Sequence, residues 1–112
     1  MARARDKTDL LPGTLDMIVL RTLSVQSMHG YAISQQVAKL SEGVLKADPG
    51  SLYPSLERLQ RHGWVKSKWT KSPTGRRARY YTITATGEAQ LGHELDSFER
   101  FLVAMRRVMN GA

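Results

Sequence analysis

The spacing of the apolar residues changes abruptly at Gly63, and this change limits the folds that are open to the chain. Before it, Leu52, Leu56 and Leu59 recur at helical spacing and lie within about 60° of one another on one helix face. After it, the segment WVKSKWT alternates apolar and polar residues, which is typical of a strand with one covered face. A helix followed so closely by a strand predicts a mixed domain with both kinds of element.

The helix before Gly63 has recognisable signals at its ends. Asp48 offers an N-cap, and Pro49 suits the first helical position. Gly63 is a typical helix stop. Pro54 lacks an N–H and disturbs a helix interior, so the start of this helix, either at Asp48 or near Pro54, stays open.

Helices and a hairpin are predicted on either side of this element. Apolar residues recur at helical spacing in residues 11–26 and 31–40. The segments 64–70 and 79–84 read as two strands around a turn that contains Pro and Gly, and Thr84 or Thr86 caps a final helix. The fold class is therefore mainly α with a small β-hairpin, as in a winged helix-turn-helix domain followed by a long helix.

This order of elements suggests a division of the chain. We expect a flexible N-terminal arm at residues 1–10, the winged helix-turn-helix domain at 11–83 and a C-terminal dimerisation helix at 84–112.

The positive charge of the chain is concentrated in the predicted hairpin. The 112 residues contain 17 Lys and Arg against 10 Asp and Glu, a net charge of +7. Residues 64–83 alone hold six basic residues and no acidic one. Such a segment favours a polyanionic partner, either nucleic acid or a membrane surface. No apolar run approaches the roughly 18 residues of a membrane span. We expect double-stranded DNA, not a membrane, as the partner.

Composition disfavours several other classes. The chain has no cysteine, and its three histidines are scattered without a second ligand at metal spacing, so neither a metal nor another cofactor is expected. A nucleophile–base pair and a phosphate-binding loop are also missing, which argues against an enzyme. No secretory signal is apparent, and a cytoplasmic location is the simplest interpretation.

The third helix and the hairpin are the candidate DNA-binding surface. A recognition helix buries one face in its own domain and places the other in a DNA groove, while a basic hairpin lies over the phosphates. The residues expected to contact DNA are Ser51, Tyr53, Pro54, Ser55, Arg58, Arg61, Lys68, Arg76, Arg77 and Arg79. Core packing is the alternative for Tyr53, and a helix cap is the alternative for Ser51. Trp64 and Trp69 are expected to pack in the core or on the hairpin rather than to stack on bases.

The last helix carries a long apolar seam. Its members step alternately by four and three residues: Leu91, Leu95, Phe98, Leu102, Met105 and Met109. A helix of this length extends about 38 Å, more than a small domain can cover. We therefore expect a homodimer through this helix, which would place two recognition helices on an inverted repeat.

An apolar effector pocket is a further expectation. It would lie between the first helix and the last helix of the other subunit, and a plain dimer core is the alternative. The residues expected to line it are Met17, Phe98, Phe101, Leu102 and Met105, which suit flat, small aromatic ligands.

The sequence resembles the PadR family of bacterial transcriptional regulators. The resemblance is carried by LPGTLDMIVLRTL, HGYAI, GSLYPSLERLQRHGWV and GRRARYYTITATGEAQL, which together span residues 11–91. It implies a homodimeric repressor that binds an inverted repeat near promoters and that a small molecule, often aromatic, or a stress signal releases from DNA. The short tail resembles the compact branch of the family, with a single C-terminal helix. The alternative function is a winged-helix protein-interaction module that does not touch DNA.

Overall fold

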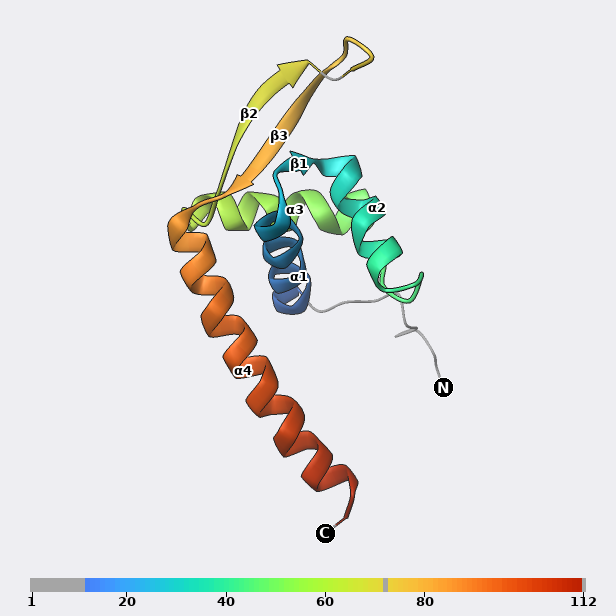
Figure 1. The fold of residues 1–112 in the computed structure, drawn as a ribbon, viewed down its shortest axis with the longest axis vertical. Coiled ribbons are helices and arrows are strands. Elements are labelled where there is room, and N and C mark those ends of the chain that lie inside the picture. Colours follow the sequence, from blue (N-terminus) through green and yellow to red (C-terminus); the bar gives the residue numbers. More distant parts are fainter. Residues whose placement is uncertain (1–11, 72, 112) are drawn as a thin grey trace.

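A small antiparallel sheet lies against a group of helices, and one long helix leads away from them (Figure 1). This computed structural model describes residues 12–71 and 73–111, and the predicted arm at residues 1–10 lies outside them. The elements of the described residues, in chain order, are α1 (Pro12–Val25), β1 (Met28–His29), α2 (Gly30–Leu40), α3 (Pro49–Arg61), β2 (Val65–Lys71), β3 (Arg77–Ile83) and α4 (Ala85–Met109). The predicted fold class, mainly helical with a small hairpin, is confirmed.

The core is built from the apolar faces of the first three helices. The leucine stripe predicted for α3 is fully buried, and it meets Val19 of α1 and Ile33 of α2 within one apolar cluster. Each of these side chains removes enough apolar surface from water to contribute about 1.5–3 kcal/mol to folding. Burial of the leucine stripe therefore decides which face of α3 is left for a partner.

The ends of α3 follow the expected signals. The Asp48 carboxylate accepts a hydrogen bond from the backbone N–H of Ser51 at 3.0 Å, and Pro49 occupies the first turn. Gly63 adopts φ = +78°, the left-handed conformation that ends a helix at little cost. The helix runs through Pro54 without interruption, so the open question about its start is settled in favour of Asp48.

The sheet has the strand order β1–β3–β2, and both pairings are antiparallel. The prediction of a hairpin is confirmed, although its strands reach further toward the turn than residues 64–70 and 79–84. At the outer end, Lys71 lies opposite Arg77. Strand β1 was not, because two residues are too few to show a period of two. It adds a second anchor for the hairpin, since His29 Nε2 lies 3.2 Å from Thr70 Oγ1.

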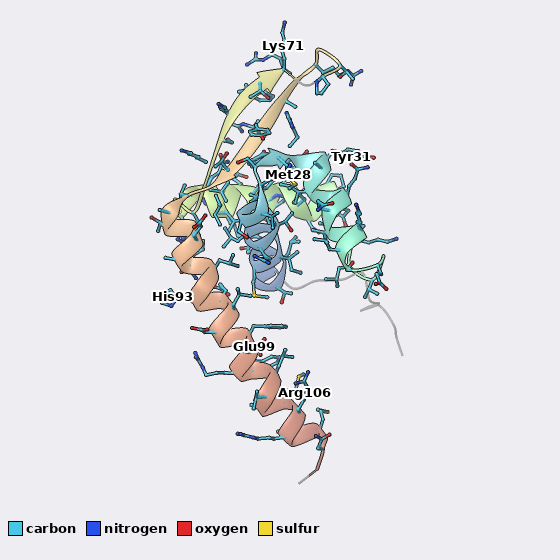
Figure 2. The ribbon with its side chains drawn as sticks, in the orientation of Figure 1. Met28, Tyr31, Lys71, His93, Glu99 and Arg106 are labelled. Atoms are coloured by element: carbon cyan, nitrogen blue, oxygen red, sulfur yellow. The ribbon has the colours of Figure 1, made fainter. Side chains whose placement is uncertain are left out.

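The start of α4 is fixed tightly to the rest of the domain. Thr84 is its N-cap: the Thr84 hydroxyl accepts from the Gly87 N–H at 3.0 Å and donates to the Gly63 carbonyl at 2.7 Å. A β-carbon at Gly87 would collide with the carbonyl oxygen of Trp64. Glycine is therefore required at this point of close approach. Beyond this first part, α4 extends away from the other elements, with Arg106 near its far end (Figures 1 and 2).

Candidate nucleic-acid interface

Helix α3 and the hairpin are held side by side. The Ser67 hydroxyl of β2 donates to the side-chain oxygen of Gln60 on α3 at 2.5 Å, and the Trp64 N–H donates to the Leu59 carbonyl at 3.0 Å. These contacts connect the two elements over the short turn at Gly63. The hairpin therefore has a defined position beside α3, with Lys71 at the end far from the helices (Figure 2).

The outer face of α3 leaves several predicted residues accessible. Ser51 and Pro54 are exposed, and the Tyr53 side chain is 46% exposed. The Arg61 side chain is 65% exposed, and its nearest acidic partner is Glu57, with a long N–O separation of 3.9 Å. An exposed pair of this kind contributes little to stability, so the Arg61 guanidinium can turn to another partner without much loss.

Two residues that were expected to contact DNA are bonded to Asp16 of α1 instead. Ser55 is completely buried, and its hydroxyl donates to Asp16 Oδ1 at 2.5 Å. Arg58 donates to both oxygens of the same carboxylate, at 2.8 and 3.1 Å. The expectation for Ser55 is wrong, because α1 covers its side of α3. The Arg58 side chain is paired with Asp16 and remains 32% exposed.

Asp16 is a structural residue that the sequence analysis missed. It is the acceptor that joins α1 to Ser55 and Arg58 of α3, and its side chain is only 21% exposed. The hydrogen bond to this carboxylate raises the pKa of Arg58 above its ordinary value, although burial partly opposes the shift. The available signal was a single acid within the otherwise apolar run LPGTLDMIVL.

The hairpin presents its basic residues to solvent. The four hairpin residues predicted to contact DNA are all exposed, as a phosphate contact requires: Lys68, Arg76, Arg77 and Arg79. Arg77 and Arg79 lie over the ring of Trp69, each with its guanidinium carbon 5.2 Å from the ring centroid. Trp69 thus packs on the hairpin, as expected for it, but it leaves 54% of its surface exposed.

A cleft of about 480 Å³ separates this face of the hairpin from the helices. It is lined by His29, Gly30, Tyr31, Tyr53, Trp69, Arg77, Ala78, Arg79 and Tyr81. Aromatic and cationic side chains therefore converge here, and the lining contains no acidic residue. Burial raises the pKa of the Tyr81 phenol, while the charge of Arg79 lowers it to a smaller extent.

Two other classes of site find no support in the described part of the chain. No group of three or more His, Cys, Asp or Glu side chains within residues 12–71 and 73–111 could hold a metal ion. Across the same ranges, no helix has the length and apolar character needed to cross a bilayer.

The apolar seam of α4 divides into two parts. Leu91 is only 6% exposed and belongs to the core of its own domain, so its assignment to a dimer contact is wrong. It is buried because the first turns of α4 pack against α1. The later members of the seam are more accessible. Leu95, Phe98, Met105 and Met109 have substantial exposed surface, and Leu102 is half-buried.

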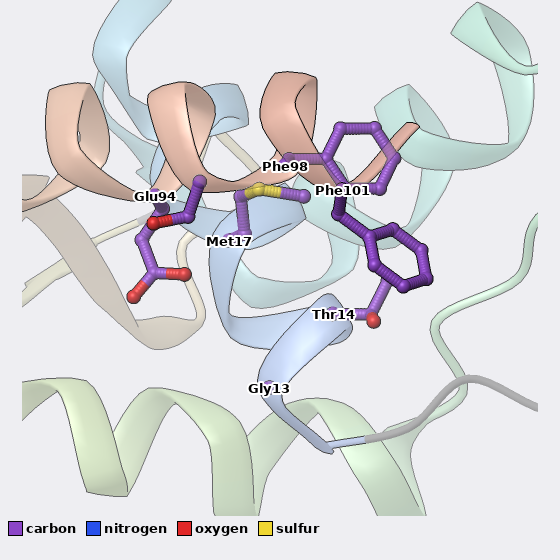
Figure 3. A pocket seen from close by; sticks show the side chains of 7 residues that line it. Gly13, Thr14, Met17, Glu94, Phe98 and Phe101 are labelled. Carbon is purple, nitrogen blue, oxygen red and sulfur yellow. The ribbon is translucent and has the colours of Figure 1, made fainter. Parts of the chain in front are cut away.

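A cavity of about 370 Å³ lies between α1 and α4 of the same chain (Figure 3). Met17, Phe98 and Phe101 line it, as predicted for an effector pocket, together with Thr14 and Glu94. The two remaining predicted residues, Leu102 and Met105, are not part of its lining. The pocket was expected between the first helix and the last helix of the other subunit. The cavity in the structure differs, because both of its helices belong to the same chain.

The fold is a winged helix-turn-helix domain, and its basic hairpin lies beside an exposed helix face. These two features define the class of the protein: a winged-helix transcription regulator. The chain belongs to the PadR-like family of transcriptional regulators, whose model matches residues 19–93.

Individual relatives agree with this assignment. The transcriptional regulator Rv3488 of Mycobacterium tuberculosis is 30% identical over 93 residues, which cover 83% of this chain and 80% of that protein. A PadR-like transcriptional regulator from Bacillus cereus has a solved structure with a TM-score of 0.74 and 26% identity, covering 89% of this chain and 95% of its own. A PadR family regulator from Clostridium difficile gives a TM-score of 0.75 and 25% identity, with 87% and 99% covered.

Proposed function

We propose that the protein is a cytoplasmic transcriptional repressor that binds a specific DNA sequence as a homodimer and leaves it in response to a small molecule or a stress signal. The observation that carries this proposal is the position of the hairpin. The hairpin carries six basic residues and no acidic one, and its inner end is attached to α3 beside the exposed face of that helix. A groove-binding helix next to a phosphate-binding hairpin is the arrangement that a DNA duplex fits.

The proposed contacts separate into two kinds. On α3, Ser51, Pro54 and Arg61 face the DNA groove, and the Arg61 guanidinium can bond a guanine edge through two hydrogen bonds. Tyr53 lies beside them, and its hydroxyl faces a backbone phosphate. On the hairpin, cationic side chains contact backbone phosphates and add affinity that depends little on sequence. This second set comprises Lys68, Arg76, Arg77 and Arg79. Ser55 and Arg58 are left out, because Asp16 holds both of them.

The proposed dimer uses the outer part of α4. With 25 residues, this helix is about 38 Å long, and its later turns expose Phe98, Met105 and Met109 to solvent. A second copy of the chain would cover these side chains. A two-fold axis through paired α4 helices would place two α3 helices in major grooves about 34 Å apart, on an inverted repeat.

The proposed signal site is the cavity between α1 and α4. Its contact surface comes from Met17, Phe98 and Phe101, which suit a flat aromatic ligand. A ligand in this cavity would contact α4, the helix that also carries the proposed dimer contact. A displacement screen with planar aromatic compounds tests this part, and it fails if no compound both binds and releases operator DNA.

Footprinting on the DNA upstream of the protein's own gene tests the main proposal. Arg61→Ala should weaken binding to the protected sequence by about 1–3 kcal/mol, and binding to a random duplex by less. Arg106→Ala is the matched control, because it removes the same charge from the far end of α4. Equal losses on both duplexes would show that Arg61 reads no base.

Salt titration tests the hairpin. The triple substitution of Arg76, Arg77 and Arg79 by alanine should weaken binding to every duplex. It should also lower the slope of log K against log salt by about 0.9 for each lost phosphate contact. An unchanged slope would remove the hairpin from the interface. Absence of binding to any duplex would favour a protein-interaction module instead.

A further inference from the structure

The cleft between the hairpin and the helices contains a large aromatic side chain whose exposure needs an explanation. Trp69 keeps 54% of its surface in contact with solvent, although the hairpin core is made without it by Val65 and Tyr81, which are both buried. Burying Trp69 is therefore not what stabilises this part of the domain. Its position among charged neighbours points to another role.

Strand register places Trp69 and two arginines on one face of the hairpin. Trp69 is the cross-strand partner of Arg79, and Arg77 lies two residues before Arg79, so its side chain leaves the same face of the sheet. Tyr81, two residues further on, is buried against the helices, which shows that this face is turned toward them. The two guanidinium groups are thus directed into the cleft rather than toward the far side of the hairpin.

The indole ring restricts where these guanidinium groups can be. Both guanidinium carbons lie 5.2 Å from the ring centroid, within the range of a cation–π contact, and Trp is the aromatic residue that binds cations best in this way. An exposed arginine otherwise samples many rotamers and loses that freedom when it binds an anion. A ring that already restricts both side chains reduces this loss.

The opposite wall of the cleft supplies a fixed hydroxyl group. Tyr53 of α3 lines the cleft, and its ring lies so close to α2 that a β-carbon at Gly30 would be 2.5 Å from the hydroxyl oxygen. The Tyr53 ring therefore packs on the backbone at Gly30, and a side chain at this position would displace it. Two arginines and the Tyr53 hydroxyl line a space of about 480 Å³ whose lining has no acidic residue. Planar guanidinium forks match the oxygens of a phosphate group.

We propose that Trp69 is a positioning residue for DNA binding: its ring holds Arg77 and Arg79 in the cleft opposite Tyr53, and the cleft binds one phosphate of the DNA backbone. This inference rests on the proposed DNA-binding function. Trp69 itself need not touch a base. Its ring lowers the entropy that the two arginines lose on binding. It therefore raises the affinity for DNA without changing the charge of the protein.

Substitution of the ring tests the positioning role. Trp69→Ala keeps every charge, yet it should weaken duplex binding about 5- to 30-fold, because the two arginines lose the restriction that two cation–π contacts give them. Trp69→Phe keeps an aromatic face and should restore most of the affinity, which also guards against a loss of folding. In ¹⁵N relaxation of the arginine side chains, the Nε–H groups of Arg77 and Arg79 should become more mobile in Trp69→Ala, while that of Arg61 should not change.

A mutant cycle separates positioning from a direct contact. In a chain that carries Arg77→Ala and Arg79→Ala, adding Trp69→Ala should change the affinity less than about twofold, because the ring has nothing left to hold. The double variant Arg106→Ala, Arg107→Ala is the matched background. It removes two charges from the last turn of α4, away from the cleft, and there Trp69→Ala should keep its full effect. A full effect in the Arg77→Ala, Arg79→Ala background would overturn the proposal.

Uncharged replacements of single DNA phosphates test whether the cleft binds a phosphate. In the footprinted duplex, each phosphate in turn is replaced by an uncharged methylphosphonate. At one position in each half-site, the wild type should lose affinity while the Arg77→Ala, Arg79→Ala variant should not. If no such position exists, the phosphate assignment is wrong. If the wild type binds no duplex at all, the proposed function fails, whereas wild-type binding with an unaffected Trp69→Ala variant overturns the positioning role alone.

Discussion

Replacing Asp16 with alanine should destabilise the domain through a hydrogen bond that is lost in its interior. The Ser55 hydroxyl is fully buried and donates to this carboxylate, so Asp16→Ala leaves it without its acceptor, at a cost of about 1–3 kcal/mol. Arg58 loses its partner as well, but its side chain is 32% exposed, and water compensates for most of that loss, so we add only about 0.2–1 kcal/mol. The expected decrease in the free energy of unfolding is about 1–4 kcal/mol.

Companion substitutions show which part of the network matters. Asp16→Asn keeps an oxygen acceptor for Ser55 and should cost about 1 kcal/mol. Ser55→Ala removes the buried hydroxyl donor, so no group is left without a partner. It should also lower the free energy of unfolding by no more than about 1 kcal/mol. The double variant Asp16→Ala, Ser55→Ala should therefore be at least as stable as Asp16→Ala alone, although it carries one more substitution.

Urea unfolding followed by far-UV circular dichroism measures these differences. The reasoning is refuted if Asp16→Ala unfolds with the free energy of the wild type, or if the two alanine substitutions add. Arg58→Ala provides a functional check: it should lower stability by about 1 kcal/mol and should not change discrimination between operator and random duplex. Selective loss of operator binding would show that Arg58 reads DNA after all.

Three further substitutions test other parts of the structure. Gly87→Ala should destabilise by about 1–3 kcal/mol in thermal unfolding because its β-carbon has no room, whereas Gly92→Ala, with open space in the same helix, should be neutral or stabilising by up to about 1 kcal/mol. Burial raises the folded-state pKa of Tyr81, so the associated stability is present below about pH 10 and is lost as the pH rises through the folded pKa. Unfolding at increasing alkaline pH should therefore show the wild type losing stability relative to Tyr81→Phe, and parallel curves would contradict this. The double substitution Phe98→Glu, Leu102→Glu should yield monomers in analytical ultracentrifugation because it places repelling charges in the dimer seam; a wild type that is monomeric at micromolar concentration would disprove the dimer.

The sequence by itself determined most of the secondary structure, because the signals involved are local. Asp48 and Pro49 mark the start of α3, Gly63 marks its end, and Thr84 caps α4, each through contacts within a few residues or through its own backbone preference. The basic hairpin was equally visible, since charge and a period of two can be counted along the chain. The winged-helix class followed from the order of these elements.

Only the tertiary structure decided which side chains of those elements are free to act. Helical spacing placed Arg58 opposite the leucine stripe, but α1 crosses that flank, and Asp16, 42 residues earlier, holds its guanidinium. Leu91 fitted the dimer seam by spacing, yet the first turns of α4 pack on α1 and bury it. Likewise, the cleft at Trp69 depends on how the hairpin faces α2 and α3. A periodic pattern specifies the faces of one element, whereas the neighbour that covers each face is set by contacts between residues far apart in the chain.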